Sequence, residues 1–495
     1  MRALTILSTL GFALTGLPLS AAQDEAATTR HEVEVDGRAL SYTAFVDRLP
    51  IRGLEADKPR AYIAFVAYRM PAEPGAGPRP VTFIWGGGPG SSGLGVHMNW
   101  GPKRVVDGDL EDNGLTLLGE TDLVFVDPVG TGFSRPARSE YADEFYSVRG
   151  DARSIAEFVR VWLRVYGEGP SPLFLAGVSY GVWRAVSVAE RLEQDGTQVA
   201  GLVLASGGMG LGTEVAPREI VEAHRIPGRT ATALHHGQLP EEIAATRSEA
   251  LVAGEQWALD VYAPALRRIA SLTDEEREAV ARDLARFTGY PPERIDRRTL
   301  RITPREYLQG MLMEEGRSLE QYDMRQTRPS GSGSIPSSST DVGIDDQRRM
   351  QYLRHDLAYR TDLAYLGVES GYTPIMGPEP SSVGQRWSYD SGSITPEVVE
   401  AAQAGEGPPG AEPWLLRAIE QNPQLGALFG VGLFDSLNSC SGNQELRDRL
   451  DPAVAQNIQL KCYVGGHGFH REEAPSRQQF AVDIRTFIQN TAGGR

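Results

Sequence analysis

Cysteine is scarce in this chain, with only two cysteines among 495 residues. Two thiols cannot build the dense disulfide framework of a small secreted scaffold, or a zinc site with four thiolate ligands. Positive charge is also in short supply, because 49 Lys and Arg residues face 65 Asp and Glu residues, for a formal net charge of −16. Nucleic acid and anionic membrane surfaces require a basic cluster, and the sequence has none, so we expect neither as a partner.

Long hydrophobic runs are missing as well, apart from one at the amino terminus. The apolar stretch 3–19 follows Arg2 and is shorter than the about 20 residues that a membrane-spanning helix needs. Ser20 and Ala22 then supply the small residues that signal peptidase recognises just before its cleavage site. We therefore predict a signal peptide over residues 1–22 and a secreted or periplasmic protein without a membrane span.

Hydrophobic residues make up 41% of the chain, which is enough for a large core. Helix-like spacing of apolar residues occurs over 155–165 and 182–192. Short apolar or alternating runs typical of strands occur at 31–45, 61–68, 81–85, 122–126, 173–176 and 202–205. Strands that alternate with helices predict an α/β fold, with a mostly parallel central sheet covered by helices on both faces.

This alternation stops after residue 210 and resumes only near residue 425. The chain between is rich in charge and in helix-favouring stretches such as 274–287. Two further strand-like runs, 425–434 and 458–463, and a helical stretch around 477–488 complete the pattern. We expect one sheet domain made from residues 23–210 and 425–495, interrupted by a largely helical cap over residues 211–424.

One strand–turn–helix in the sequence carries the pattern G-x-S-x-G, at residues 177–181. The glycines flank Ser179, where bulkier side chains would collide in the strained turn that exposes a serine hydroxyl at the carboxyl edge of the sheet. An ordinary turn is the alternative, but the apolar strand before it and the helix after it favour a nucleophile. We predict that Ser179 is that nucleophile.

A serine nucleophile needs a base and an acid that orients the base, and in this type of sheet they follow it in the order acid, then histidine. His467 stands in a glycine-rich turn after a strand, with His470 as the second choice. Asp435 ends the preceding strand-like run, although an aspartate there could instead cap a helix. We predict Ser179, Asp435 and His467 as a catalytic triad.

The developing oxyanion needs two well-placed N–H donors. A glycine-rich loop, GGGPGSS at 86–92, follows the strand 81–85 and offers bare backbone amides. A phosphate-binding loop is the weaker reading, because no Gly-Lys-Ser/Thr follows. We predict the N–H groups of Gly88 and of Tyr180, which follows the nucleophile, as the oxyanion hole. Nothing in the sequence points to a metal or an organic cofactor.

These motifs resemble those of the serine carboxypeptidase-like family of α/β-hydrolases, in its secreted bacterial type. Four matches occur in the family's order: GGPGSS at 87–92 with a Gly-Pro pair at 101–102, PVGTGFS at 128–134, SYG at 179–181, and Gly466-His467. The resemblance implies an α/β-hydrolase fold, the same triad, the same oxyanion hole and a serine-type peptidase. It also implies a peptide or another small acyl compound as the substrate.

The sequence departs from that family where carboxypeptidases hold the carboxylate of their substrate. The family uses an Asn in the glycine loop and a Glu before the nucleophile, supported by a Trp and a second acidic residue. The corresponding substrate-binding positions here are Gly86, Val178, Ile84 and Asn99, and Gly87 lies beside the first of them. Gly and Val have no side-chain group that can bind a carboxylate. The usual network for a free C-terminus is therefore absent.

A peptidase remains possible if Lys103, Arg104 or Arg184 binds the carboxylate instead. Otherwise the enzyme could be an esterase, amidase or acyltransferase whose substrates have no free carboxylate. A binding protein that has lost catalysis on the same scaffold is a third possibility, but it would not require an intact triad.

The two cysteines, Cys440 and Cys462, lie on either side of the stretch between the predicted acid and base. In an exported protein we expect them to form a disulfide, the alternative being two buried free thiols. Such a bond would connect the two loops that carry Asp435 and His467.

Overall fold

The computed structural model describes residues 26–54, 57–72, 75, 77–211, 217–332, 344–370, 382–391, 412–471 and 475–493. The predicted signal peptide, residues 1–22, lies outside this part of the chain. None of the helices in the described ranges is both long enough and apolar enough to cross a lipid bilayer.

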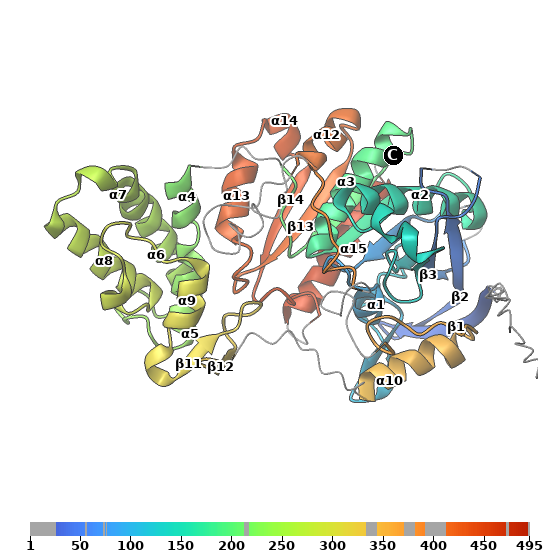
Figure 1. Cartoon of the computed structure of the whole chain (residues 1–495), viewed down its shortest axis with the longest axis horizontal. Helices are drawn as coiled ribbons and strands as arrows, with labels where there is room; N and C mark the ends of the chain where they lie inside the picture. The colour runs from blue at the N-terminus through green and yellow to red at the C-terminus, as the bar shows by residue number, and fades with distance from the viewer. Residues whose placement is uncertain are drawn as a thin grey trace, which may run out of the picture.

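A ten-stranded sheet forms the centre of the molecule (Figure 1). The strand order is β1-β2-β3-β7-β4-β9-β10-β13-β14, and a short β8 pairs with β3. The pairs from β1 to β7 are antiparallel, whereas those from β7 to β14 are parallel. The bounds are β1 Ala27–Val35, β2 Arg38–Ile51, β3 Ala61–Arg69, β4 Val81–Trp85, β7 Asp122–Val126, β8 Arg135–Pro136, β9 Leu173–Val178, β10 Gly201–Ala205, β13 Gly426–Gly432 and β14 Ile458–Tyr463.

The expected parallel, buried sheet is confirmed for β4, β7, β9, β10 and β13, and β14 is a parallel edge strand that is partly exposed. The structure adds an antiparallel edge on the opposite side. The stretch 31–45, expected to be strand-like, is a hairpin of β1 and β2. Its turn is Asp36-Gly37, where both residues have positive φ. Asp and Gly tolerate that left-handed backbone better than most residues, so the chain reverses there.

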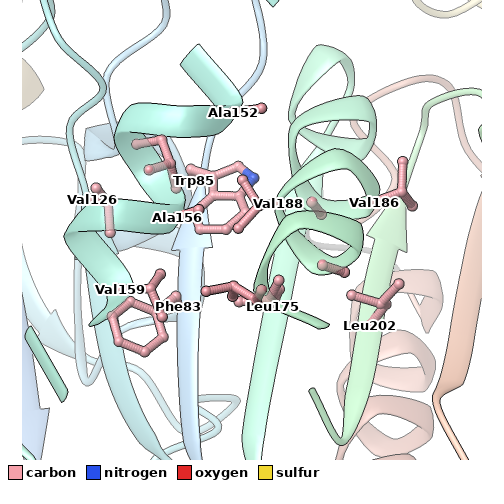
Figure 2. Packing of buried hydrophobic residues seen from close by; sticks show 14 of the residues in the cluster. Phe83, Trp85, Val126, Ala152, Ala156, Val159, Leu175, Val186, Val188 and Leu202 are labelled. Atoms are coloured by element: carbon pink, nitrogen blue, oxygen red, sulfur yellow. The ribbon is translucent and has the colours of Figure 1, made fainter. Parts of the chain in front are cut away.

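Successive residues of each buried strand point to opposite faces of the sheet, and each face has its own core. Phe83 and Trp85 of β4 pack into one core, and Ile84 packs into the other. Figure 2 shows the first core, where strand residues such as Phe83 and Leu175 face α2 and α3. That face is covered by α2 Val148–Tyr166, α3 Tyr180–Gln194 and α12 Trp414–Gln421, and the other by α1 Leu94–Trp100 and α15 Pro475–Gly493.

Helix α2 follows the periodicity that predicted it, with one exception. Ile155, Phe158 and Trp162 are buried against the sheet, but Val165 is 58% exposed near the end of the helix. The Oγ atom of Ser147 accepts a hydrogen bond from the N–H of Gly150, which caps the first turn. The apolar stripe continues instead to Tyr166, the last residue of the helix, whose ring packs against Phe65.

The inserted segment divides into two groups in space. Residues 217–332 form a helical body to the left of the sheet in Figure 1, with a third hydrophobic core to which Phe434 of the sheet domain contributes. Its elements are α4 Arg218–Ala223, α5 Ile226–His235, α6 Arg247–Trp257, η2 Ala258–Tyr262, α7 Ala263–Arg267, η3 Ile269–Ser271, α8 Asp274–Thr288, η4 Pro292–Arg294, α9 Pro304–Gly310, η5 Met313–Glu315, β11 Arg317–Leu319 and β12 Thr327–Pro329. The helical stretch expected at 274–287 is α8. We call residues 217–332 the cap body.

The later part of the insertion returns to the sheet domain. Tyr352 and Leu353 belong to the core on the α15 face, whereas Val383 and Leu415 belong to the core on the α2 face. A largely helical insertion was expected over 211–424, but its described residues beyond 343 pack on the sheet and not on the cap body. The remaining elements are β5 Lys103–Val106, β6 Asp109–Asp112, η1 Ser139–Glu144, α10 Ile344–Gln351, η6 Tyr352–Asp356, α13 Cys440–Asp448 and α14 Pro452–Ala455.

Candidate active site

Ser179 occupies the turn between β9 and α3 with a strained backbone, φ 58° and ψ −126°. A Cβ atom on Gly177 would collide with the carbonyl oxygen of Gly181, so the turn requires the first glycine of G-x-S-x-G. The N–H of Ser179 donates to the carbonyl of Ala205 at the end of β10, at 2.9 Å. The sequence pattern thus corresponds to a sharp strand-to-helix turn at the carboxyl edge of the sheet, as predicted.

Asp435 and His467 meet at the same edge. Asp435 follows β13, His467 follows β14, and Nδ1 of His467 donates a hydrogen bond of 2.7 Å to Oδ2 of Asp435. The carboxylate also accepts from the N–H of Leu437 and the Nδ2 of Asn438, both at 3.0 Å, and its side chain is fully buried. Helix α13 is capped by Ser439, so Asp435 is not a helix cap.

His467 is connected to the Ser179 turn through Ser206 and Ala205. Ser206, directly after β10, donates from Oγ to the carbonyl of His467 at 2.7 Å. Its neighbour Ala205 accepts from the N–H of Ser179. Among the described side chains no hydrogen bond joins Ser179 itself to His467. The structure therefore pairs Asp435 with His467 and places Ser179 on the adjoining turn.

The glycine loop lies directly against the nucleophile. A Cβ atom on Gly87 would be 2.7 Å from the Cβ of Ser179, so no larger residue fits there. Gly88 is exposed and has φ of 108°, a conformation that favours glycine. Tyr180 is the first residue of α3, where N–H groups have no acceptor within the helix. The two predicted donors thus belong to segments that flank Ser179.

Asp127, directly after β7, binds Gly93, the residue that follows the glycine loop. Its carboxylate accepts hydrogen bonds from the N–H of Gly93 at 2.8 Å, the N–H of Phe133 at 3.2 Å and the hydroxyl of Tyr365 at 2.9 Å. Burial raises the pKa of this carboxyl above its usual value, and the hydrogen bonds oppose that effect. Asp127 therefore connects Gly93, the residue after the glycine loop, with Phe133 of the segment 128–134.

The predicted substrate-binding positions have separate roles in the structure. The carbonyl of Gly86 accepts from Nη1 of Arg184, and Val178 is buried at the end of β9. Asn99 donates from Nδ2 to the carbonyl of Gly95 in its own helix, at 2.6 Å. Gly86, Gly87 and Val178 thus adjoin Ser179 in the fold, whereas the amide of Asn99 bonds within α1.

Arg184 is the one alternative carboxylate ligand that the structure contradicts. Its side chain is 1% exposed, and its Nε donates to Oδ2 of Asp151 at 2.7 Å. A guanidinium that is already paired and buried cannot reach a substrate carboxylate. Lys103 and Arg104 lie on β5, where Lys103 forms an ion pair with Asp112 of β6.

His470, the second choice for the base, is a core residue. Its ring packs edge-on against Trp100, with centroids 5.9 Å apart, and it is 5% exposed. Burial, with smaller contributions from the charges of Arg471 and His467, lowers the pKa of His470 to about 3. It therefore stays neutral over the range in which a catalytic histidine must exchange protons.

The disulfide between Cys440 and Cys462 is present, as predicted, with Cα atoms 6.0 Å apart. Cys440 begins α13 after the Asp435 turn, and Cys462 is on β14 before the His467 turn. The bond thus links the two segments that carry the acid and the base.

Sequence reasoning missed Tyr322, which lies in the turn between β11 and β12 of the cap body. Its ring is 55% exposed and its centroid is 5.2 Å from that of His467. Its carbonyl accepts from the N–H of His467 at 2.6 Å. The turn is far from the triad in sequence and has no motif, so no sequence pattern pointed to it.

One segment of the chain resembles a known protein family. Residues 66–195, about a quarter of the chain, match the family model described as serine carboxypeptidase. The matched segment includes the glycine loop, the 128–134 segment and the Ser179 turn. No curated protein matches the sequence significantly.

Solved structures resemble the chain at low identity. The proline iminopeptidase of Mycobacterium smegmatis is 13% identical, with 94% of this chain and 99% of that chain covered and a TM-score of 0.34. Potato (Solanum tuberosum) epoxide hydrolase I is 12% identical, with 90% of this chain and 99% of that chain covered and a TM-score of 0.36. The haloalkane dehalogenase of Bradyrhizobium elkani is 12% identical, with 91% of this chain and 100% of that chain covered and a TM-score of 0.34. The chain has an α/β-hydrolase fold, and its residues 66–195 are similar to the serine carboxypeptidase family.

Proposed function

We propose that the protein is an exported serine hydrolase that cleaves peptide bonds through an acyl-enzyme on Ser179. The observation that carries this proposal is the 2.7 Å hydrogen bond between Asp435 and His467, at the sheet edge where Ser179 occupies its strained turn. A carboxylate that orients an imidazole beside a serine is the arrangement that activates a hydroxyl for acyl transfer. The family match over 66–195 supports a serine hydrolase.

The reaction would proceed in two halves. Oγ of Ser179 attacks the substrate carbonyl carbon and gives its proton to Nε2 of His467, while Asp435 stabilises the imidazolium. The oxyanion accepts hydrogen bonds from the N–H groups of Gly88 and Tyr180. The bond to the leaving group then breaks, and the leaving group takes the proton from His467. Water, activated by the same histidine, releases the acyl product and restores Ser179.

A second function, as an esterase, amidase or acyltransferase, is favoured by the residues around the nucleophile. Val178 and Gly86 stand where carboxypeptidases have their carboxylate ligands, and the carbonyl of Gly86 is bonded to Arg184. Neither side chain can bind a free C-terminus. Loss of one buried polar partner costs about 1–3 kcal/mol, so loss of several weakens selection for that end of a peptide.

A fluorophosphonate probe tests the proposal, because it labels only an activated serine. We expect the wild-type protein to be labelled and Ser179→Ala to remain unlabelled. Ser139→Ala is the matched control, since it removes an exposed serine hydroxyl on η1 that contacts none of the three triad residues. Absence of Ser179-dependent labelling in folded protein would favour a binding protein that has lost catalysis.

A substrate panel distinguishes the two catalytic functions. It comprises a peptide with a free C-terminus, the same peptide with its C-terminus amidated, and an aryl ester. A carboxypeptidase requires the free acid. If the ester is hydrolysed and neither peptide is cleaved, the second function holds.

A further inference from the structure

A buried arginine beside the nucleophile takes no part in the triad. Arg184 lies on α3, five residues after Ser179, and its partner Asp151 is in the first turn of α2. Nε of Arg184 donates to Oδ2 of Asp151 at 2.7 Å, and both side chains are at most 4% exposed. Burying two charges is costly unless their hydrogen bonds are satisfied, so each donor of this guanidinium matters.

A second donor of Arg184 reaches the glycine loop. Nη1 donates to the carbonyl of Gly86 at 2.9 Å. Gly86 directly precedes Gly87, the residue that packs against Ser179. The guanidinium therefore fixes one peptide group of the loop at the point where the loop approaches the nucleophile.

Another contact joins the same two segments. Nε1 of Trp85 donates to the carbonyl of Gly181 at 2.9 Å, and it is buried at the end of β4. A Cβ atom on Gly181 would lie 2.5 Å from the carbonyl oxygen of Gly86. The loop and the start of α3 are thus in direct contact, and two hydrogen bonds cross between them.

Arg184 also contacts the residue that follows the nucleophile. Its guanidinium carbon lies 5.3 Å from the centre of the Tyr180 ring, within the range of a cation–π interaction. The two N–H groups assigned to the oxyanion hole belong to Gly88 in the loop and to Tyr180 on α3. Arg184 therefore bonds to Gly86, two residues before Gly88, and also packs against the ring of Tyr180.

We propose that Arg184, held by Asp151, is a positioning residue that sets the spacing between the N–H groups of Gly88 and Tyr180. This inference rests on the proposed function, because it assigns a role to Arg184 in the oxyanion hole of that same site. Donors of an oxyanion hole act by being fixed before the reaction, so a small change in their spacing weakens transition-state binding more than substrate binding. Arg184 never touches the substrate.

The rigid fork of arginine explains why this position is not a lysine. A guanidinium can donate from Nε to one acceptor and from Nη1 to another in a fixed geometry, whereas an ammonium is a single point on a flexible stem. Lysine at 184 would keep the charge opposite Asp151 but would not hold both the carboxylate and the Gly86 carbonyl.

Four variants test the proposal in the full-length protein. Arg184→Met removes both hydrogen bonds at similar volume, Arg184→Lys keeps the charge, and Asp151→Asn leaves the arginine without its ionic partner. Arg417→Met is the matched control, because it removes an ion pair between α12 and Glu190 of the same helix α3, away from the glycine loop. Thermal unfolding establishes that each variant is folded.

Kinetics on the best substrate of the panel give the first readout. For Arg184→Met we expect kcat to fall by about 10²-fold, similar to the loss of one oxyanion donor, with KM changed less than about threefold. Arg184→Lys and Asp151→Asn should lie between this variant and wild type. Affinity for an aryl boronic acid, whose tetrahedral adduct places an oxygen in the oxyanion hole, should fall in parallel with kcat.

Hydrogen exchange gives a readout that does not depend on hydrolysis. The peptide that covers residues 86–92 should exchange faster in Arg184→Met than in wild type, and Arg417→Met should leave it unchanged. Unchanged exchange and unchanged kcat in folded Arg184→Met would overturn the proposal, as would an equal loss in Arg417→Met. If Arg184→Met does not fold, the lysine and asparagine variants decide by the same readouts. If wild-type Ser179 is unreactive, the proposed function fails, while the exchange comparison still tests the positioning of the loop.

Discussion

The carbonyl oxygen of Tyr322 accepts a hydrogen bond of 2.6 Å from the backbone N–H of His467. The same turn of the cap body accepts from Oγ of Ser436 through the carbonyl of Gln321, at 2.7 Å, and its Met324 N–H donates to the carbonyl of Phe434 at 2.9 Å. These three bonds connect one turn of the cap body with the residues on either side of Asp435 and with His467 itself. The cap body is thus connected to the Asp435 and His467 turns through its own backbone groups, and its side chains add contacts such as that of His235 with Phe434.

The ring of Tyr322 should contribute to catalysis through its contact with His467. Tyr322→Ala keeps the carbonyl that bonds to His467 but removes the ring. A ring pair contributes about 0.5–1.5 kcal/mol, so kcat/KM should fall about threefold to tenfold. Tyr322→Phe, which keeps the ring, is the control and should match wild type. Steady-state kinetics check this, and an alanine variant as active as wild type would show that the contact has no catalytic role.

Asp435→Asn should abolish most activity without unfolding the protein. Asparagine has the same shape, but its amide cannot stabilise the imidazolium or hold the required tautomer of His467. In other serine hydrolases this change lowers kcat by about 10⁴-fold. Asn438→Ala, which removes only the 3.0 Å bond to the same carboxylate, should lose far less. If both variants lose the same small amount, Asp435 is not the orienting acid.

Much of the site could be predicted because its residues lie in local patterns. A strand, the G-x-S-x-G turn and a helix specify Ser179 within one short stretch. The two glycines of the pattern already indicate that the turn has no room for larger side chains. The sequence does not by itself separate His467 from His470, since both follow the same glycine-rich turn. Burial distinguishes them: His470 packs against Trp100, whereas His467 bonds to Asp435.

The contacts that sequence could not predict are between segments far apart in the chain. Tyr322 reaches the base through a backbone carbonyl, a group that every residue has, so its side-chain type carries no signal. The sequence also gives no sign that Tyr352 and Leu415, both in the inserted segment, pack in the cores of the sheet domain. An apolar stripe shows that a helix is buried on one side, but it does not show which core receives it.

The disulfide should stabilise the fold and the spacing of the acid and base turns. In the chain-entropy model, a loop with a sequence separation of 22 contributes about 3 kcal/mol to the free energy of unfolding. The double variant Cys440→Ala/Cys462→Ala should lose about that amount in urea unfolding. Thiol titration of the unreduced, unfolded wild-type protein is the control and should find no free thiol. Two free thiols would contradict the bond.

His470 should make the protein less stable in acid. Its pKa is about 3 in the folded state, whereas an exposed histidine has a pKa of about 6.5, so between these values the unfolded chain binds a proton that the folded chain does not. Its contribution is therefore complete above about pH 6.5 and is lost as the pH falls toward 3, by about 1.4 kcal/mol per pH unit. Urea unfolding at about pH 5 and about pH 6 measures this slope.

His470→Gln, which cannot titrate, should reduce that slope by about one proton, or about 1.4 kcal/mol per pH unit. The comparison uses slopes because the substitution also alters packing against Trp100 and so shifts stability at every pH. His97, whose pKa burial also lowers to about 3, remains in the variant, so some acid sensitivity should persist. Equal slopes in wild type and variant would mean that His470 accepts a proton in the folded state, and would restore it as a rival to His467 for the role of the base.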